Sequence, residues 1–575
     1  MKKIITFFIV FNIMILNVTS YAFGDNVNEM YSNTISVYGG IYYAIKNDGS
    51  LWAWGGNGQY TYIGDGTAQP NTEPVKIMDD VKSVNQYYAI KNDNSLWTWG
   101  KSEFCKNDNE NHKVYLSPVK VMEDVMNVSA GGGSALIVKK DGSLWGIGTN
   151  SFGQLGKKDE DTYYSTPIKI MNHVKDAACG YCHSVALKDD GSVWTFGSNG
   201  YGQLGIGVND RFDKIHSKTK IMENVKDIDA GQSATFAISE EDNLWRWGTN
   251  YGDGIGIGAD AIKRKPVQYI KDARSVSSHW GFNLVVKNDN TLWIYGETDD
   301  EKEGYTFSYV DQMVGISLEL PLKLMDDVNS ISEWTFESGH KSLILNNSGE
   351  LFEFDLLEGE IPYTPKFEIV KVMDDVRLME PAQMKESKDF VDLADASDEM
   401  KKAIQALSKA DVMNGTSETE FSPDKSITRA ELAAVILRLT TQQEEKENGG
   451  FSDVTRDKWY YGVAGASKKY GIMNGFEDNT FRGDEIITKE QIVALVARTL
   501  QAENEDFEDV EPDKIEEQLA FFKDAGQISD WAKAHIAFAI RENLVPLEDW
   551  PFFVPDREVT RGDAAVILYR LYNKV

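Results

Sequence analysis

Three short segments of the sequence place a cation where a helix is expected to begin. They read Ile427-Thr428-Arg429-Ala430-Glu431, Ile487-Thr488-Lys489-Glu490-Gln491 and Val559-Thr560-Arg561-Gly562-Asp563. In each, a threonine is followed three residues later by Glu, Gln or Asp, which is the pattern of an N-terminal capping box. Because a helix start favours acidic groups, a cation that recurs there indicates a site for an anionic ligand.

Other features recur in step with these cations. An acidic residue opens each unit, in Phe390-Val391-Asp392, Phe451-Ser452-Asp453 and Phe522-Lys523-Asp524. Turn glycines follow at Gly415 and Gly475, whereas the third unit has Pro546-Leu547 at that place. After the first and third caps, apolar residues recur at the spacing of one helix face. The sequence therefore predicts three helical repeats, over residues 390–440, 451–500 and 522–575.

These repeats resemble the S-layer homology (SLH) repeat, whose signature phrase is the same Ile-Thr-Arg-Ala-Glu. The resemblance implies a three-pronged all-α bundle that binds secondary cell-wall polysaccharide of Gram-positive bacteria, commonly pyruvylated, in grooves between the repeats. Carried over, the polymer-binding residues are Arg429, Lys489, Arg561, Asp392, Asp453, Asp524, Gly415 and Gly475. Arg holds a carboxylate with two parallel hydrogen bonds, whereas Lys489 offers a point charge and predicts a less selective groove. The alternative is a structural salt bridge between Arg429 and Asp392.

A second region is built from one phrase that recurs seven times between residues 42 and 354. It begins as Tyr43-Ala44-Ile45-Lys46-Asn47-Asp48-Gly49-Ser50-Leu51-Trp52, and its aromatic returns at Trp97, Trp145, Trp194, Trp245, Trp293 and Phe352. Each copy reads as strand, turn and strand, with Gly or Asn closing the turn. A second phrase, first seen at Pro74-Val75-Lys76-Ile77-Met78, adds a further strand pair. Four strands per unit predict a seven-bladed β-propeller over residues 31–379.

The best-preserved unit runs from His183-Ser184-Val185-Ala186-Leu187 to Gly202-Gln203-Leu204-Gly205 and resembles the repeat of the regulator-of-chromosome-condensation family. Because the repeat aromatics occupy one position per unit, they are predicted to pack between blades and not to bind sugar rings. A specific partner is expected at the long loops, Gly55 to Thr72, Lys101 to Ser117 and Thr298 to Glu319. The fold alone does not name a function.

The segment Cys179-Gly180-Tyr181-Cys182-His183 spells the string by which haem is attached covalently. It falls inside the repeated unit, where other copies have Gly131 and Ser134. Blade packing therefore explains it, and we predict neither a cofactor nor a metal. The chain has three cysteines, so no disulfide framework is expected, and a Cys179–Cys182 disulfide is the minority alternative.

The first residues have the layout of a secretory signal. Lys2 and Lys3 precede an apolar run from Ile4 to Val18 and the small-residue site Ser20-Tyr21-Ala22, which predicts a signal peptide over residues 1–22. A retained N-terminal anchor is the alternative, and no membrane segment is expected after signal removal. The net charge of −31 argues against nucleic acid and anionic lipid as partners.

Together these observations predict an all-β seven-bladed propeller, a linker over residues 380–389 and an all-α three-repeat bundle. The expected function is that of a secreted cell-surface protein, held on the cell wall by its SLH repeats, whose propeller binds an extracellular protein. The alternative is a secreted propeller that acts as an inhibitor or receptor of another extracellular protein. A wall-associated hydrolase is the third possibility. We predict no enzyme and no catalytic residue, because the repeats fill nearly all of the chain after the signal.

Overall fold

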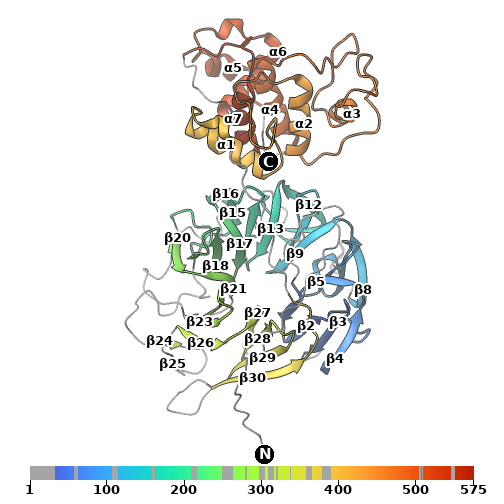
Figure 1. The fold of residues 1–575 in the computed structure, drawn as a ribbon, viewed down its shortest axis with the longest axis vertical. Helices are drawn as coiled ribbons and strands as arrows, with labels where there is room; N and C mark the ends of the chain where they lie inside the picture. The colour runs from blue at the N-terminus through green and yellow to red at the C-terminus, as the bar shows by residue number, and fades with distance from the viewer. Residues whose placement is uncertain are drawn as a thin grey trace, which may run out of the picture.

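The computed structural model describes residues 33–575 except for 57–61, 106–113, 158–161, 209–215, 249–262, 279–281, 297–304, 308–315, 319–320, 337–338, 358–365, 379–389, 504–506, 508 and 546–550. The predicted signal peptide, the predicted linker and Pro546-Leu547 lie outside the described residues. Figure 1 shows the strands arranged as a ring and the helices gathered in a second domain beside β12, β13 and β16. The predicted fold class is confirmed.

Seven antiparallel four-stranded sheets form the blades of the ring. Blades 1 and 2 contain β1 (Ile35–Tyr38), β2 (Ile41–Ile45), β3 (Leu51–Gly55), β4 (Asn71–Met78), β5 (Val81–Asn85), β6 (Tyr88–Lys91), β7 (Leu96–Gly100) and β8 (Tyr115–Met122), with the 3₁₀ helix η1 (Glu103–Cys105) before β8. Blades 3 and 4 contain β9 (Val125–Gly131), β10 (Ser134–Lys139), β11 (Leu144–Thr149), β12 (Tyr163–Met171), β13 (Val174–Cys179), β14 (His183–Lys188), β15 (Val193–Gly197) and β16 (His216–Met222).

The remaining three blades follow the same antiparallel order. Blade 5 contains β17 (Val225–Ala230), β18 (Ala234–Ser239), β19 (Leu244–Gly248) and β20 (Lys263–Ile270). Blade 6 contains β21 (Ala273–Ser278), β22 (Phe282–Lys287), β23 (Leu292–Gly296) and β26 (Leu322–Met325), with the hairpin β24 (Tyr305–Phe307) and β25 (Ile316–Leu318) inserted before β26. Blade 7 contains β27 (Val328–Phe336), β28 (Gly339–Asn346), β29 (Leu351–Leu357) and β30 (Lys366–Met373).

The repeated turn owes its shape to one residue with positive φ. That residue is Gly49, Asn94, Gly142, Gly191, Asp242, Asn290 or Gly349, in blade order. Blade 5 differs from the sequence prediction, because Asp242 and not Asn243 takes the left-handed conformation. In blades 1 and 2 an Asp carboxylate accepts from a serine, which in turn accepts the indole N–H, as in Asp48, Ser50 and Trp52. This relay locks the turn to the following strand.

The propeller core lies between neighbouring blades. Trp99 of blade 2 is fully buried, and its Nε1–H donates to the Tyr43 hydroxyl of blade 1 at 3.2 Å. Trp54 and Trp247 occupy the same position in their blades and are also buried. The repeat aromatic Trp97 is only partly buried, although it packs on the same core. The deepest aromatics are therefore the second of each Trp pair.

The ring closes by joining its two ends within blade 1. Val376 forms a bridge with Lys46, and the Arg377 N–H donates to the Ile45 carbonyl at 2.8 Å. The Ile45 N–H donates in turn to Thr34 at 2.9 Å. In blade 2 one strand, β5, makes both sets of contacts, and its pairing register shifts between Val81 and Ser83. In blade 1 two separate chain segments make them, and the junction between these segments falls at the corresponding position.

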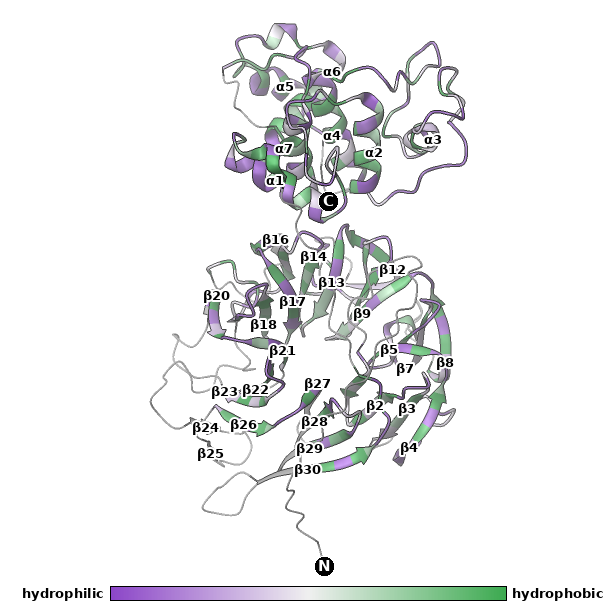
Figure 2. Cartoon of the chain, viewed as in Figure 1, coloured by the Kyte–Doolittle hydropathy of each residue, from purple (hydrophilic) through white to green (hydrophobic). Residues whose placement is uncertain are grey.

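The helical domain contains η3 (Val391–Leu393), α1 (Asp398–Lys409), α2 (Arg429–Leu439), α3 (Tyr461–Lys469), α4 (Lys489–Glu503), α5 (Pro512–Leu519), η4 (Ala525–Gln527), α6 (Asp530–Arg541) and α7 (Arg561–Tyr572). One continuous apolar core joins the three repeats. Figure 2 shows hydrophobic residues along α4 and α7, which lie inside the bundle. Among the described residues, no helix is both long and apolar enough to cross a membrane.

The predicted capping boxes set the start of the three central helices. The boxes of Thr428 with Glu431 and of Thr560 with Asp563 are complete in both directions. At α4 the Thr488 N–H donates to the Gln491 side chain at 3.2 Å. Isolated β-bridges join the segments before these helices, pairing Ser426 with Thr560, Thr428 with Ile486 and Thr488 with Glu558. The three helix starts are thereby tied together around a pseudo-threefold centre.

Candidate functional site

Each cation at a helix start reaches into the loop of the next repeat. Arg429 of the first repeat donates its Nε–H to the Phe481 carbonyl of the second at 2.9 Å. Arg561 of the third repeat donates in the same way to Phe421 of the first at 3.0 Å. Lys489 of the second repeat lies over the Phe553 ring of the third, with Nζ 5.3 Å from its centroid. Three grooves between repeats therefore each contain one of the predicted cations.

The first backbone N–H groups of these helices are already used. Those of Arg429 and Ala430 donate to Glu485 and Gly483, both at 2.9 Å. The same two positions of α4 and α7 donate to loop carbonyls of repeats 3 and 1. Because these carbonyl oxygens face the helix start, they offset the unfavourable interaction between the cation and the helix dipole. The helix amides do not form an open anion site, and an anion would have to bind the side-chain cation.

The predicted aspartates fix the loops that receive the cations. Each carboxylate accepts two backbone N–H groups: Asp392 from Phe421 (3.0 Å) and Ser422 (2.6 Å), Asp453 from Phe481 (2.7 Å) and Arg482 (2.7 Å), and Asp524 from Phe553 (2.7 Å) and Val554 (2.7 Å). Burial raises the pKa of Asp392, but these amides outweigh it and hold the pKa below its ordinary value. The aspartates thus act on backbone, and their role is to shape the loop.

The pairing of cations and aspartates differs from the order in the sequence. Arg429 lies against the loop fixed by Asp453, and Arg561 against the loop fixed by Asp392. The described residues contain no ion pair between Arg429 and Asp392, so the salt-bridge alternative is wrong for this pair. Each groove therefore combines a cation of one repeat with the loop of the next.

The predicted glycines permit close packing of these loops. Gly475 has φ +79°, and a Cβ atom there would lie 2.3 Å from the Phe451 ring. A Cβ atom on Gly415 would lie 2.5 Å from both the Phe390 ring and the Glu420 carbonyl oxygen. Any side chain at these two positions would displace the aromatic residue beneath the loop.

The three cations differ in exposure. Arg561 is 7% exposed and also donates to the Asn414 carbonyl at 2.7 Å, and Lys489 is 3% exposed. Arg429 is partly exposed, and its two terminal nitrogens make no hydrogen bond with the described residues. Burial lowers the pKa of Arg429; the charge of Glu485 opposes this shift, and Arg482 and Arg498 add to it. Of the three predicted cations, Arg429 in the groove between repeats 1 and 2 is therefore the one that is partly exposed.

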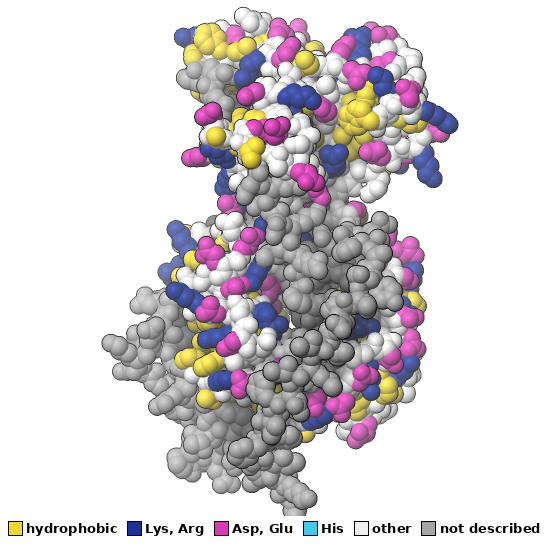
Figure 3. All heavy atoms as spheres, in the orientation of Figure 1, with side chains coloured by type: hydrophobic (Ala, Val, Ile, Leu, Met, Phe, Trp, Pro, Cys, Tyr) yellow, Lys and Arg dark blue, Asp and Glu magenta, His cyan; other side chains and the backbone are white. Residues whose placement is uncertain are grey.

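The Phe476 ring lies against the cation of this groove, and other aromatic residues of repeat 2 lie close by; neither was predicted from the sequence. The Arg429 guanidinium lies 4.9 Å from the Phe476 centroid, and Arg482 lies 3.9 Å from the same ring. Trp459 is 59% exposed and contacts Tyr460, which packs against Phe481. Figure 3 shows hydrophobic side chains among acidic and basic ones on the face of the helical domain in view. In the sequence, these groove aromatics are marked only by their position inside polar segments.

The cysteine segment of the propeller has the contacts of packed core. His183 is buried, and its Nε2 lies 3.0 Å from the Thr235 hydroxyl of blade 5. Burial lowers the pKa of His183 to about 4 and raises the pKa of Cys179 to about 12. Cys179 and Cys182 are both unpaired, so the alternative disulfide is not formed. The described residues contain no cluster of His, Cys, Asp and Glu suited to a metal.

Comparison with protein families agrees with both parts of the chain. The S-layer homology domain model matches residues 389–433, 450–493 and 521–565. Models of the regulator of chromosome condensation (RCC1) repeat match residues 141–187, 190–238 and 174–203. Solved structures that the chain resembles include human WBSCR16, at 17% identity and a TM-score of 0.39 over 55% of this chain and 87% of that one.

Curated relatives match through the helical domain. Exoglucanase XynX of Acetivibrio thermocellus is 34% identical over 192 residues, which are 33% of this chain and 17% of that protein. Amylopullulanase of Thermoanaerobacterium thermosulfurigenes is 34% identical over 30% of this chain and 9% of its own. The surface-layer 125 kDa protein of Lysinibacillus sphaericus is 28% identical over 30% of this chain and 14% of its own.

The chain spans less than a fifth of the length of these relatives. The glycosidases among them match only through their SLH regions. The chain therefore joins a seven-bladed propeller with RCC1 repeats to three S-layer homology domains, and it is a cell-surface protein anchored by those domains.

Proposed function

We propose that the helical domain binds an acidic, pyruvylated cell-wall polysaccharide in the groove between repeats 1 and 2, and that the propeller is displayed to bind an extracellular protein. The observation that carries the first part is the partly exposed Arg429 guanidinium, whose terminal nitrogens have no partner among the described residues. Its Nε is held by the Phe481 carbonyl, so the free edge has a fixed direction. A preorganised guanidinium suits a planar carboxylate.

The composition of the groove supports a sugar that carries a carboxylate. A ketal-linked pyruvate presents one carboxylate on a rigid ring, which matches one fixed guanidinium. The exposed Trp459 indole gives a flat apolar surface on which a sugar face can stack. Partial burial of Arg429 reduces screening and strengthens its attraction for a carboxylate.

The curated relatives support an anchoring role for the region that they share with this chain. Their names describe polysaccharide hydrolases and surface-layer proteins, and these classes have no common activity. A module found with such different partners is suited to attachment. We propose no catalytic activity for this chain, because the region shared with the glycosidases is the anchor. The propeller remains the recognition domain, and an inhibitor or receptor role is the alternative for it.

Sedimentation with isolated cell walls tests the anchoring proposal. The full chain is pelleted with walls that carry a pyruvylated polymer, and with the same walls after mild acid has hydrolysed the pyruvate ketals. Arg429→Gln removes the charge but keeps a donor for the Phe481 carbonyl. Arg438→Gln, on the same helix and bonded to Val412 O at 3.4 Å, is the matched control.

We expect binding to native walls, loss of binding after ketal removal, and weakening of about tenfold or more for Arg429→Gln, as for a lost charged hydrogen bond. The Arg438→Gln control should bind as the wild type does. If the wild type does not pellet with native walls, anchoring to this polymer is wrong. If Arg429→Gln pellets normally with an unchanged circular dichroism spectrum, the assignment to this groove is wrong.

A further inference from the structure

The helices that carry the groove cations end on the propeller. α2, α4 and α7 begin at Arg429, Lys489 and Arg561 and run to Leu439, Glu503 and Tyr572. The far end of each contacts blade 4, the turn before it or β12, the last strand of blade 3, and Figure 1 shows the helical domain on this side of the ring. The last carbonyl groups of a helix lack partners within the helix and form the negative end of its dipole.

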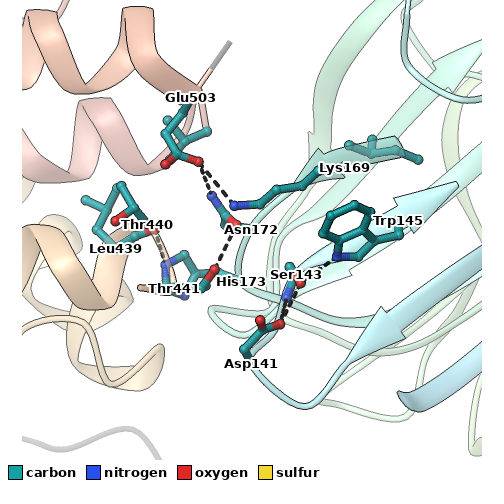
Figure 4. Close-up of polar contacts among 12 residues, drawn as sticks. Asp141, Ser143, Trp145, Lys169, Asn172, His173, Leu439, Thr440, Thr441 and Glu503 are labelled. Carbon is teal, nitrogen blue, oxygen red and sulfur yellow. Dashed lines mark hydrogen bonds and ion pairs between the residues drawn. The ribbon is translucent and has the colours of Figure 1, made fainter. Parts of the chain in front are cut away.

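Two of the three contacts involve the turn between blades 3 and 4 (Figure 4). His173 Nε2 lies 2.6 Å from the carbonyl oxygen of Leu439, the last residue of α2. Lys169 Nζ and Asn172 Nδ2 both lie 3.2 Å from the carboxylate of Glu503, the last residue of α4. His173 is 5% exposed, so the helical domain covers this turn.

The third contact is made by a fully buried lysine. Lys188, at the end of β14, donates Nζ–H to the backbone oxygens of Tyr572 and Val575, both at 2.8 Å. The same ammonium lies 4.5 Å from the Tyr572 ring centroid and 5.1 Å from that of Trp194. Lys188 is 0% exposed, so these backbone oxygens take the place of water around its ammonium group. The same burial lowers the pKa of Lys188 to about 7.

Blade 4 has adapted a feature that other blades share. Lys46, Lys91 and Lys287 stand at the same place in their hairpins and lie over Trp52, Trp97 and Trp293, with Nζ 4.6–5.0 Å from the ring centroid. Those lysines are partly exposed, whereas Lys188 is 0% exposed. Around it, Lys402 pairs with Glu223 at 2.8 Å, and Lys409 pairs with Glu240. Lys188 of blade 4, Asn172 and His173 of the preceding turn, and Lys169 of blade 3 therefore face the three helix ends inside a rim of ion pairs.

We propose that this face, formed by blade 4 together with the turn before it and the end of β12, is a docking site for the C-terminal ends of the three groove helices, so that propeller and helical domain form one rigid body in solution. The propeller then sits at the end of the bundle opposite the groove cations. The chemical partner of the site is a set of helix carbonyl groups and one carboxylate of the same chain. This inference does not depend on which polymer the grooves bind.

Small-angle X-ray scattering and calorimetry of the full chain test the proposed docking site. Lys188→Met keeps the apolar stem and removes the donor. Lys91→Met removes the equivalent lysine of blade 2 and is the matched control. We expect one coupled thermal transition and a compact scattering profile for the wild type and the control. Lys188→Met should separate the transitions and shift the radius of gyration upward.

A charge exchange keeps the test decisive if Lys188→Met does not fold. Glu503→Lys places two cations together at the edge of the docking site, where both side chains are partly exposed. It should enlarge the scattering radius, and the double variant Lys169→Glu/Glu503→Lys should restore the wild-type value. Unchanged scattering in Glu503→Lys, or enlargement that the exchange does not reverse, would overturn the proposal. Wall sedimentation, measured separately, reports only on the grooves.

Discussion

Arg561 donates its Nε–H to the carbonyl oxygen of Phe421, which precedes it by 140 residues, at 3.0 Å. This bond closes a cycle in which repeat 1 reaches repeat 2, repeat 2 reaches repeat 3, and repeat 3 returns to repeat 1. The cations are therefore structural parts of the bundle as well as candidate ligand groups. Their exposure separates the two roles, because the buried Arg561 serves the fold more than Arg429 does.

We predict that Arg561→Met destabilises the helical domain by about 2–3 kcal/mol, because the buried Phe421 carbonyl loses the donor that Arg561 supplies. Arg429→Met should lose roughly 1 kcal/mol, since water can reach its groove. Urea unfolding followed by circular dichroism at the helical minimum measures both changes. Equal losses for the two variants would contradict the assignment of roles.

The loops fixed by the three aspartates hold a residue at positive φ. These residues are Ser422, Arg482 and Val554, at 59°, 56° and 55°. A β-branched side chain is strained there, whereas asparagine tolerates this conformation. We predict that Val554→Asn stabilises the helical domain by about 1 kcal/mol in thermal unfolding. As a control, Val391→Asn, also at an exposed valine, should change the free energy of unfolding by less than about 0.5 kcal/mol. A loss of stability in Val554→Asn would show that the backbone at Val554 is not strained.

Asp176 gives the propeller a pH dependence. Burial, together with the charge of Asp227, raises the pKa of Asp176 to about 8. In the unfolded chain the pKa of an Asp carboxyl is about 4. Between these values the folded state holds a proton that the unfolded state has lost, so propeller stability should fall as the pH rises from about 4 to 8.

Asp176→Asn keeps the acceptor for the Ala177 N–H and removes this proton linkage. Asn127 already occupies the equivalent position in blade 3 and accepts the Val128 N–H. We predict that the variant gains melting temperature over the wild type, and gains more at pH 8 than at pH 5. Melting curves of the full chain at several pH values measure this difference, and a gain that does not vary with pH would show that Asp176 is ionised throughout.

Blade 5 lacks the relay that fixes the turn in blades 1 and 2. Glu241 and Asn243 replace its Asp and Ser, and the buried Trp245 Nε1–H has no hydrogen-bond partner within the described part of the chain. We predict that Glu241→Asp/Asn243→Ser stabilises the propeller by about 1 kcal/mol, because the serine hydroxyl can accept the indole N–H. Ser95→Ala in blade 2 should lose a similar amount by breaking the relay. Both are read by thermal unfolding, and a neutral double variant would mean that the indole is already solvated.

The repeats made the fold predictable because turn chemistry and hydrophobic spacing recur in every copy. Seven turns of one pattern indicated a ring, and the cap residues located α2, α4 and α7. The sequence did not predict which repeat each cation contacts. Arg429 lies between Asp392 and Asp453 in a regular repeat, so spacing alone favours neither aspartate. The loop that Arg429 contacts depends on how the three repeats are arranged in the bundle.

The docking site was not predicted from the sequence, for a related reason. Lys188 belongs to the same repeated phrase as Lys46 and Lys91, so nothing in its local sequence marks it as different. Only the approach of α7 changes its surroundings. The aromatic residue Trp459 was missed because tryptophan in a folded chain is more often core than surface.

The closure of blade 1 by Val376 and Arg377 sets an order of events during synthesis. A chain made from its N-terminus has six blades that can form as their strands emerge, but the inner strand of blade 1 stays incomplete. Its missing piece arrives only when residue 377 has been added, before any helix of the anchor domain has been made. Blade 1, whose strands are made first, is therefore completed last. The helical domain is synthesised only after the propeller has all the residues that it needs to close.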